Sequence, residues 1–221
     1  MFEPDDRALA SAGAFGMPEP QDVQAVVFDV GRVLVDWDLR HLFGKLIADP
    51  AELEWFVANV VTEAWHFEHD AGRDLAEMVD QRKREFPAHA ALIDAYATRF
   101  LETIPGPVPG TAALVDRLAA RGVPLYAITN FAAPFWTAFV PMQAVLGHFR
   151  DVVVSGEEKL VKPGRAIFDL AARRFGHAPE TMLFIDDSAA NVEAAAALGW
   201  QTHRFRDAQT LEADLVRRKL L

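Results

Sequence analysis

Cysteine is absent from this chain of 221 residues. The absence excludes a disulfide framework, a thiolate metal site and a cysteine nucleophile. Basic residues are also scarce, because 22 lysines and arginines stand against 32 aspartates and glutamates, which gives a net charge of −10. Proteins that bind nucleic acids need a basic surface, so we expect no nucleic-acid partner.

Long apolar runs are missing as well. No stretch reaches the roughly 18 residues that a membrane-spanning helix needs, and the acidic Asp5 and Asp6 stand where a secretory signal peptide would be basic. We therefore predict no membrane partner and a cytoplasmic location. Hydrophobic residues make up 51% of the chain and charged residues 24%, the balance of a globular protein. Nothing in these numbers indicates an oligomeric state.

Short apolar runs alternate with helical segments in the second half of the chain. Strands are predicted near residues 24–28, 123–129, 151–155, 181–185 and 200–205, and helices near 111–121, 163–175 and 188–198. This alternation predicts an α/β fold with a doubly wound, Rossmann-like parallel sheet. A helical block from about 39 to 103 interrupts the rhythm after the first strand, which predicts an inserted helical cap.

The expected organisation follows from these patterns. Residues 1–22 are predicted to form a loose N-terminal tail, residues 23–37 and 107–221 the α/β core, and residues 38–106 the helical cap. The Pro/Gly stretch IPGPVPG, residues 104–110, marks the return to the core. Within the cap, Asp49, Pro50 and Glu52 have the arrangement of a capped helix start.

Polar side chains follow three of the apolar strands. Asp29 ends the first, Thr129 and Asn130 end the second, and Asp186 and Asp187 end the fourth. In open parallel sheets ligands bind at the carboxyl ends of strands. Three carboxylates gathered there repel one another unless a cation neutralises them. The pattern therefore predicts a site for a hard, oxygen-seeking cation, most simply Mg²⁺.

A metal with carboxylate ligands is commonly accompanied by a phosphate. The groups placed to hold one are the Thr129 hydroxyl, the backbone N–H of Asn130 and Lys162, which precedes Pro163 and a predicted helix start. For Lys162 alone, an ordinary solvated surface lysine is the competing interpretation.

Taken in order, four motifs resemble those of the haloacid dehalogenase-like (HAD) superfamily. They are FDVGRVL at Asp29, ITN at Thr129, KP at Lys162, and FIDDSAAN, which ends at Asn191. The resemblance covers residues 24 to about 206. It is strongest to the branch with a C1-type helical cap, and especially to bacterial sugar-phosphate phosphatases with a DxG first motif.

The resemblance implies a Mg²⁺-dependent phosphatase acting on a small phosphorylated metabolite, with a sugar phosphate as one candidate. Asp29 would be the nucleophile that forms an aspartyl-phosphate intermediate. The metal would be held by the Asp29 carboxylate, the Gly31 carbonyl and Asp187, with Asp186 acting through water or hydrogen bonds. The phosphate would be held by the groups named above: Thr129, Asn130 and Lys162.

In its first motif, the chain departs from the family at two neighbouring positions. Most family phosphatases carry a second aspartate where this chain has Gly31, and that residue protonates the leaving group, a contribution typically of ~10²–10⁴ in rate. Arg32 stands where the family usually has Gly or Asn. Its side chain is either an extra contact for an anion or simply solvated.

The segment EAWHFEHDAG in the predicted cap holds further candidates. Trp65 or His66 could contact the substrate or leaving group. The alternative is a helix with a solvated face and Trp65 in the core of the cap. His66 and His69 have no third ligand at a recognised zinc spacing, so we discount a zinc site there.

Two other functions stay open. A 2-haloacid dehalogenase would act through an aspartyl ester on Asp29 without a metal, but those enzymes do not keep a carboxylate pair such as Asp186–Asp187 at the fourth motif. A weakly active or non-enzymatic binding protein is the second alternative, because Gly31 removes the usual acid.

Overall fold

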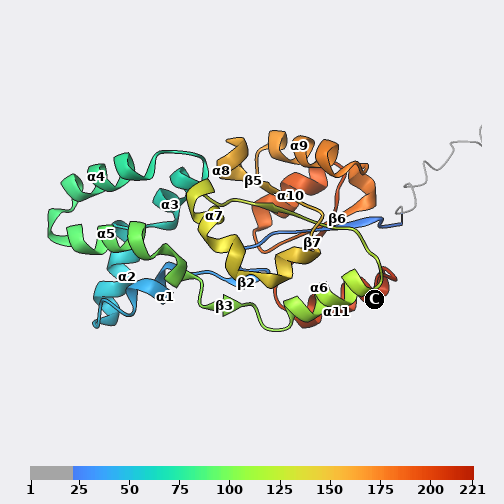
Figure 1. Cartoon of the computed structure of the whole chain (residues 1–221), viewed down its shortest axis with the longest axis horizontal. Coiled ribbons are helices and arrows are strands. Elements are labelled where there is room, and N and C mark those ends of the chain that lie inside the picture. Colours follow the sequence, from blue (N-terminus) through green and yellow to red (C-terminus); the bar gives the residue numbers. More distant parts are fainter. Residues whose placement is uncertain (1–21) are drawn as a thin grey trace, which may run out of the picture.

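The computed structural model describes residues 22–221, so the predicted tail lies outside the described residues except for Asp22. Five strands form one sheet in the order β5-β4-β1-β6-β7 (Figure 1). All neighbouring pairs are parallel, which confirms the predicted doubly wound α/β core. The strands are β1 (Ala25–Phe28), β4 (Leu125–Thr129), β5 (Asp151–Val154), β6 (Met182–Asp186) and β7 (Gln201–Arg204).

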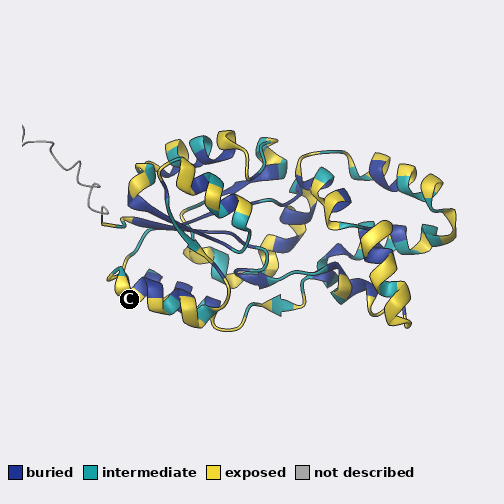
Figure 2. Cartoon of the chain, turned by 180° about the vertical axis from the view of Figure 1, so that it is seen from behind, coloured by how far each residue is buried: buried dark blue, intermediate teal, exposed yellow. Residues whose placement is uncertain are grey.

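Alternate residues of β1, the central strand, point to opposite faces of the sheet. Val26 and Phe28 pack in a core cluster with helices α6 (Thr111–Ala120) and α11 (Ala208–Arg217). Ala25 and Val27 pack in a second cluster with α9 (Arg165–Phe175) and α10 (Ala189–Ala197). Successive strand residues point to opposite faces, so a fully apolar strand needs a helical layer on each side. Figure 2 shows this buried sheet between partly exposed helices.

The inserted block is helical, as predicted. It contains α1 (Leu39–Phe43), α2 (Pro50–Asn59), α3 (Glu63–Asp70), α4 (Leu75–Glu85), α5 (Ala90–Arg99) and the 3₁₀ turns η1 (Pro87–His89) and η2 (Phe100–Thr103). In Figure 1, α2, α4 and α5 lie at the end of the molecule away from the C-terminus. The capped start at Asp49 is confirmed, since its carboxylate accepts from Ala51 N and Glu52 N.

A two-stranded antiparallel ribbon carries the chain to and from these helices. It pairs β2 (Val35–Asp36) with β3 (Gly106–Pro107), and Asp38 N donates to Thr103 O beside it at 3.1 Å. The sequence patterns did not predict these strands, because two residues are too few to show an alternation. We propose this ribbon as the boundary between core and cap, in keeping with the predicted limits.

The remaining elements lie in the core: α7 (Ala133–Phe139), α8 (Ser155–Glu158), and the 3₁₀ turns η3 (Val140–Met142), η4 (Ala144–His148) and η5 (Pro179–Thr181). The helix predicted from Pro163 begins at Arg165, with Gly164 as its N-cap. Between residues 22 and 221, no helix combines the length and hydropathy needed to cross a membrane.

Candidate active site

Three carboxylates meet at the carboxyl edge of the sheet. β1 and β6 run side by side with Phe28 opposite Ile185, so the residues that follow them are neighbours. Asp29, Asp186 and Asp187 each offer an oxygen, and these oxygens lie within 4.8 Å of one another. Opposite ligand oxygens of an octahedral Mg²⁺ are about 4.2 Å apart, twice its bond length. These residues could therefore hold such an ion after a small adjustment.

Lys162 lies inside this cluster and is not a solvated lysine. Its side chain is 1% exposed, and its Nζ lies 2.8 Å from Asp29 Oδ1 and 2.7 Å from Asp186 Oδ2. Burial alone would lower the pKa of Lys162, but the two carboxylates outweigh burial and leave that pKa above its ordinary value. The ammonium group therefore stays charged between two carboxylates.

Burial also dominates the electrostatics of the carboxylates that line the cavity. It raises the pKa of Asp29, with Lys162 opposing the rise and Asp186 adding to it. Burial likewise raises the pKa of Asp187, and the charge of Asp186 adds to that rise. Asp29 Oδ1 in addition accepts from Val30 N at 2.7 Å. A bound cation would favour the charged form of both groups.

Asp186 and Asp187 differ in what surrounds them. Asp186 is fully buried, and it accepts from Ser188 N at 2.8 Å and from Asn191 Nδ2 at 3.0–3.1 Å, besides its contact with Lys162. Asp187 lines the cavity, and no other described residue donates a hydrogen bond to its carboxylate. Of the two, Asp187 is therefore the carboxylate that is free to take a new ligand.

Asn130 fixes the lysine in place. Its Nδ2 donates to Lys162 O at 3.0 Å, and Lys162 N donates to its Oδ1 at 2.9 Å. The Asn130 side chain thus holds the Lys162 backbone in place, and Asn130 also lines the cavity. Thr129, the last residue of β4, is buried and is not among the residues that line the cavity.

The carboxylates open into a cavity of about 170 Å³ where the core meets the inserted helices. Gly31 lines it from the first loop, and a Cβ built on Gly31 would meet no atom within 4 Å. The φ of Gly31 lies outside the left-handed region, so the backbone does not require glycine there. The inserted segment closes the cavity with several side chains, among them Glu63, His66, Phe67, Asp70 and Phe100.

Arg32 bridges the first loop and the inserted helices. The backbone of Arg32 is left-handed, with φ 59°. Its guanidinium lies 4.7 Å above the Trp37 ring, donates from Nε to Trp37 O at 3.3 Å, and forms a two-armed contact with the Glu63 carboxylate. Arg32 is therefore neither simply solvated nor an unpaired cation, since Glu63 already balances its charge.

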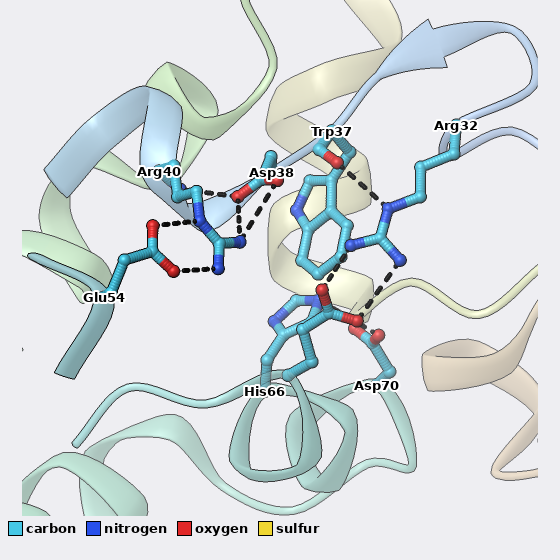
Figure 3. A network of polar contacts seen from close by, with 8 residues as sticks. Arg32, Trp37, Asp38, Arg40, Glu54, His66 and Asp70 are labelled. Carbon is cyan, nitrogen blue, oxygen red and sulfur yellow. Dashed lines mark hydrogen bonds and ion pairs between the residues drawn. The ribbon is translucent and has the colours of Figure 1, made fainter. Parts of the chain in front are cut away.

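His66 lies on the wall of the cavity. Its ring stacks between Trp37, at 4.9 Å, and Phe100, at 5.4 Å. Its Nδ1 lies 2.6 Å from the Tyr96 hydroxyl, and its Nε2 lies 3.1 Å from Asp70 Oδ2. In Figure 3, His66 and Asp70 point from the same helix toward Trp37 and Arg32.

The two expectations for the α3 segment fare differently. The helix has a solvated face at Glu63, Ala64 and Phe67, but His66 and His69 do not lie on it, because both are buried. Trp65 is buried in the core of the cap, with its ring 5.0 Å from that of Tyr96 and beneath the Arg82 guanidinium. It does not line the cavity, so a contact between Trp65 and a ligand there is not supported.

The sequence interpretation missed Asp70. This residue is buried and lines the cavity, and its Oδ1 has no hydrogen-bond partner among the described residues. The one signal in the sequence was its i,i+4 spacing from His66, which places both side chains on one helix face.

Several known proteins are similar to this chain in sequence. The family model of haloacid dehalogenase-like hydrolases matches residues 23–199. A phosphoglycolate phosphatase of Yersinia pseudotuberculosis is 30% identical over 192 residues, which cover 80% of this chain and 78% of that protein. A phosphoglycolate phosphatase of Shigella boydii is 32% identical over 108 residues, 49% of this chain and 43% of that protein. The chain thus spans less than half of the length of some curated relatives.

Solved structures share the fold. One is a HAD family enzyme of Bacteroides thetaiotaomicron in complex with magnesium and inorganic phosphate, with a TM-score of 0.61 and 23% identity, over 84% of this chain and 95% of that one. Another is the L-2-haloacid dehalogenase of Xanthobacter autotrophicus with covalently bound chloropropionic acid, with a TM-score of 0.59 and 18% identity, over 90% of this chain and 84% of that one. At these identities the likeness concerns the fold alone.

Proposed function

The chain belongs to the haloacid dehalogenase-like hydrolase family, and from this premise we propose that it is a Mg²⁺-dependent phosphatase of a small phosphorylated metabolite. One observation carries the proposal. Oxygens of Asp29, Asp186 and Asp187 converge within 4.8 Å beside the cavity, with the Lys162 ammonium between Asp29 and Asp186. Carboxylate oxygens suit a hard divalent cation, and that cation together with the Lys162 ammonium would attract an anionic substrate.

We assign the metal to Asp29, Asp187 and the carbonyl of Gly31, with Asp186 in a supporting position. Asp187 has no competing donor from another residue, whereas Asp186 is occupied by Lys162, Asn191 and Ser188. Bound there, Mg²⁺ would offset the negative charge that the phosphoryl group brings to the carboxylates.

Asp29 is the proposed nucleophile. One of its carboxylate oxygens attacks phosphorus in line, the bond from phosphorus to the leaving oxygen breaks, and an aspartyl phosphate remains on Asp29. Water then attacks that phosphorus and releases inorganic phosphate, which regenerates the carboxylate. Lys162 Nζ, 2.8 Å from Asp29 Oδ1, holds this carboxylate in place and offsets part of the added negative charge.

The rest of the phosphate site is assigned to Asn130, which lines the cavity and also holds Lys162 through its side chain, whereas Thr129 does not line the cavity and is not supported as a phosphate ligand. Arg32 is assigned to the leaving-group end, because it lines the cavity and lies over the Trp37 ring. His66 lines the same wall, but its two nitrogens already lie beside Tyr96 and Asp70, so it supports that wall and does not contact the leaving group. The two phosphoglycolate phosphatases named above favour a small phosphorylated substrate here. A sugar phosphate remains a candidate.

The test is hydrolysis of para-nitrophenyl phosphate by the wild type and by Asp29→Asn, each with Mg²⁺ and with chelator. We expect turnover only by the wild type with Mg²⁺, because the amide cannot form the acyl phosphate. Thermal melting of both proteins serves as the control for folding. Turnover that survives chelation contradicts the proposal, and chloride release from 2-chloropropionate under chelation would establish the dehalogenase alternative.

A further inference from the structure

Asp70 lines the cavity and has a buried carboxylate oxygen that no described residue satisfies. Its Oδ1 is buried without a hydrogen-bond partner, while its Oδ2 lies 3.1 Å from His66 Nε2. A buried carboxylate oxygen without a partner is costly unless it carries a proton or bonds a ligand. Because Asp70 lines the same cavity as Asp29 and Gly31, a molecule bound there is the natural partner.

The core holds the end of α3 in a defined position. The Ser155 hydroxyl donates to Asp70 O at 2.7 Å, and Phe131 N donates to the same hydroxyl at 2.9 Å. Phe131 directly follows Asn130 at the end of β4. One hydroxyl thus joins the Asp70 backbone to the strand end that carries the proposed phosphate site. A group supported in this way keeps a constant position relative to the reacting atoms.

His66 supports Asp70 and does not compete with it for a ligand. Both ring nitrogens of His66 already lie beside protein oxygens, Nδ1 at 2.6 Å from Tyr96 and Nε2 at 3.1 Å from Asp70. The faces of the ring are covered by Trp37 and Phe100. His66 therefore has no free nitrogen to give to a leaving group, whereas Asp70 has a free oxygen.

We propose that Asp70 is the acid–base residue of this enzyme and replaces the carboxylate that Gly31 lacks in the first loop. The inference rests on the phosphatase function proposed above. Protonated Asp70 gives its proton to the leaving oxygen as the bond from phosphorus to that oxygen breaks, so the product leaves as a neutral alcohol. The Asp70 carboxylate then takes a proton from the water that attacks the aspartyl phosphate of Asp29, which restores protonated Asp70 and the Asp29 carboxylate.

The decisive measurement compares two esters in Asp70→Asn. Para-nitrophenyl phosphate has a leaving group that departs unprotonated, whereas the alkoxide of glycerol 2-phosphate needs a proton. We expect kcat/KM for the alkyl ester to fall about 10²–10³-fold and that for the aryl ester less than about tenfold. Because kcat/KM covers steps only up to loss of the leaving group, the later hydrolysis of the aspartyl phosphate does not obscure the ratio.

Two further variants sharpen the measurement. Asp80→Asn is the matched control, since Asp80 is an exposed carboxylate on α4, and it should leave both esters unchanged. Gly31→Asp in the Asp70→Asn background should restore alkyl-ester hydrolysis, because the site of the new Cβ is open. If Asp70→Asn does not fold, Asp70→Ser removes the same ionisable oxygen and replaces it in the comparison.

The outcomes separate the two proposals. A wild type that hydrolyses both esters with Mg²⁺, together with an Asp70 variant whose alkyl-to-aryl ratio is unchanged, overturns the role of Asp70 alone. A wild type inactive on both esters overturns the phosphatase function and the role of Asp70 with it. A selective loss of alkyl-ester activity that Gly31→Asp repairs supports both.

Discussion

Replacing Lys162 by methionine should destabilise the metal-free protein strongly. Methionine keeps the length of the side chain but removes the charge that lies 2.8 Å from Asp29 and 2.7 Å from Asp186. Removing one partner of a buried ion pair typically costs about 3–5 kcal/mol, because the other partner keeps its buried charge. For a protein of this size, that corresponds to a fall in melting temperature of about 6–20 °C.

The assay is thermal melting at pH 7 in chelator, followed by circular dichroism. Lys83→Met is the matched control, because it removes an ion pair of the same length, 2.8 Å to Asp94, from a partly exposed position. An exposed pair contributes about 0–1 kcal/mol, so this control should melt close to the wild type. Equal melting temperatures for Lys162→Met and Lys83→Met would refute the reasoning that the buried carboxylates depend on Lys162.

The effect should depend on pH in one direction. Without Lys162, burial keeps the folded-state pKa of Asp29 even further above its unfolded value of 3.8. A group with a raised folded-state pKa favours the folded state at low pH and disfavours it as pH rises. The folded-state pKa of Asp29 in the wild type is about 8, so the gap between wild type and Lys162→Met should widen as pH rises above about 8. Added Mg²⁺ should raise the melting temperature of the variant, because it neutralises the same carboxylates.

Four further substitutions test other parts of the structure. Asp187→Ala should mainly weaken the affinity for Mg²⁺, measured by calorimetry. Asp186→Ala should mainly lower the melting temperature, since Asp186 is buried and fully bonded. The opposite order of effects would contradict the assignment of the metal ligand. Gly156→Ala should destabilise the core by more than about 1 kcal/mol, because the new Cβ would lie 2.4 Å from a backbone nitrogen, and an unchanged melting temperature would refute this. Burial would raise the pKa of Asp214, but a neighbouring arginine and histidine outweigh it and hold that pKa below 3.8. Wild type should therefore have a larger free energy of unfolding than Asp214→Asn at pH 7, and this difference should disappear as pH falls below about 4. A difference that persists at pH 2.5 in urea titrations would argue against this linkage.

Local patterns in the sequence were sufficient for the architecture. A fully apolar strand such as Ala25–Phe28 is stable only when both of its faces are covered, so alternating strands and helices already imply a parallel sheet between helical layers. The same logic put Asp29, Asp186 and Asp187 at one edge, because parallel strands place their carboxyl ends together. The helix start at Asp49 was predictable since its capping hydrogen bonds involve only adjacent residues.

Only the tertiary structure decided what the side chains around the carboxylates do. Lys162 precedes the α9 turn and could have been solvated, but it is enclosed by a strand end from each of β1 and β6. The residues around His66 in the sequence are typical of a surface helix. In the structure, however, the rings of Trp37 and Phe100 cover both faces of the His66 ring. The position of Asp70 depends on Ser155, which is far away along the chain and whose hydroxyl donates to the Asp70 backbone carbonyl. Such contacts join residues that are distant in sequence, and no local periodicity records them, because they arise only when the inserted helices fold back over the sheet.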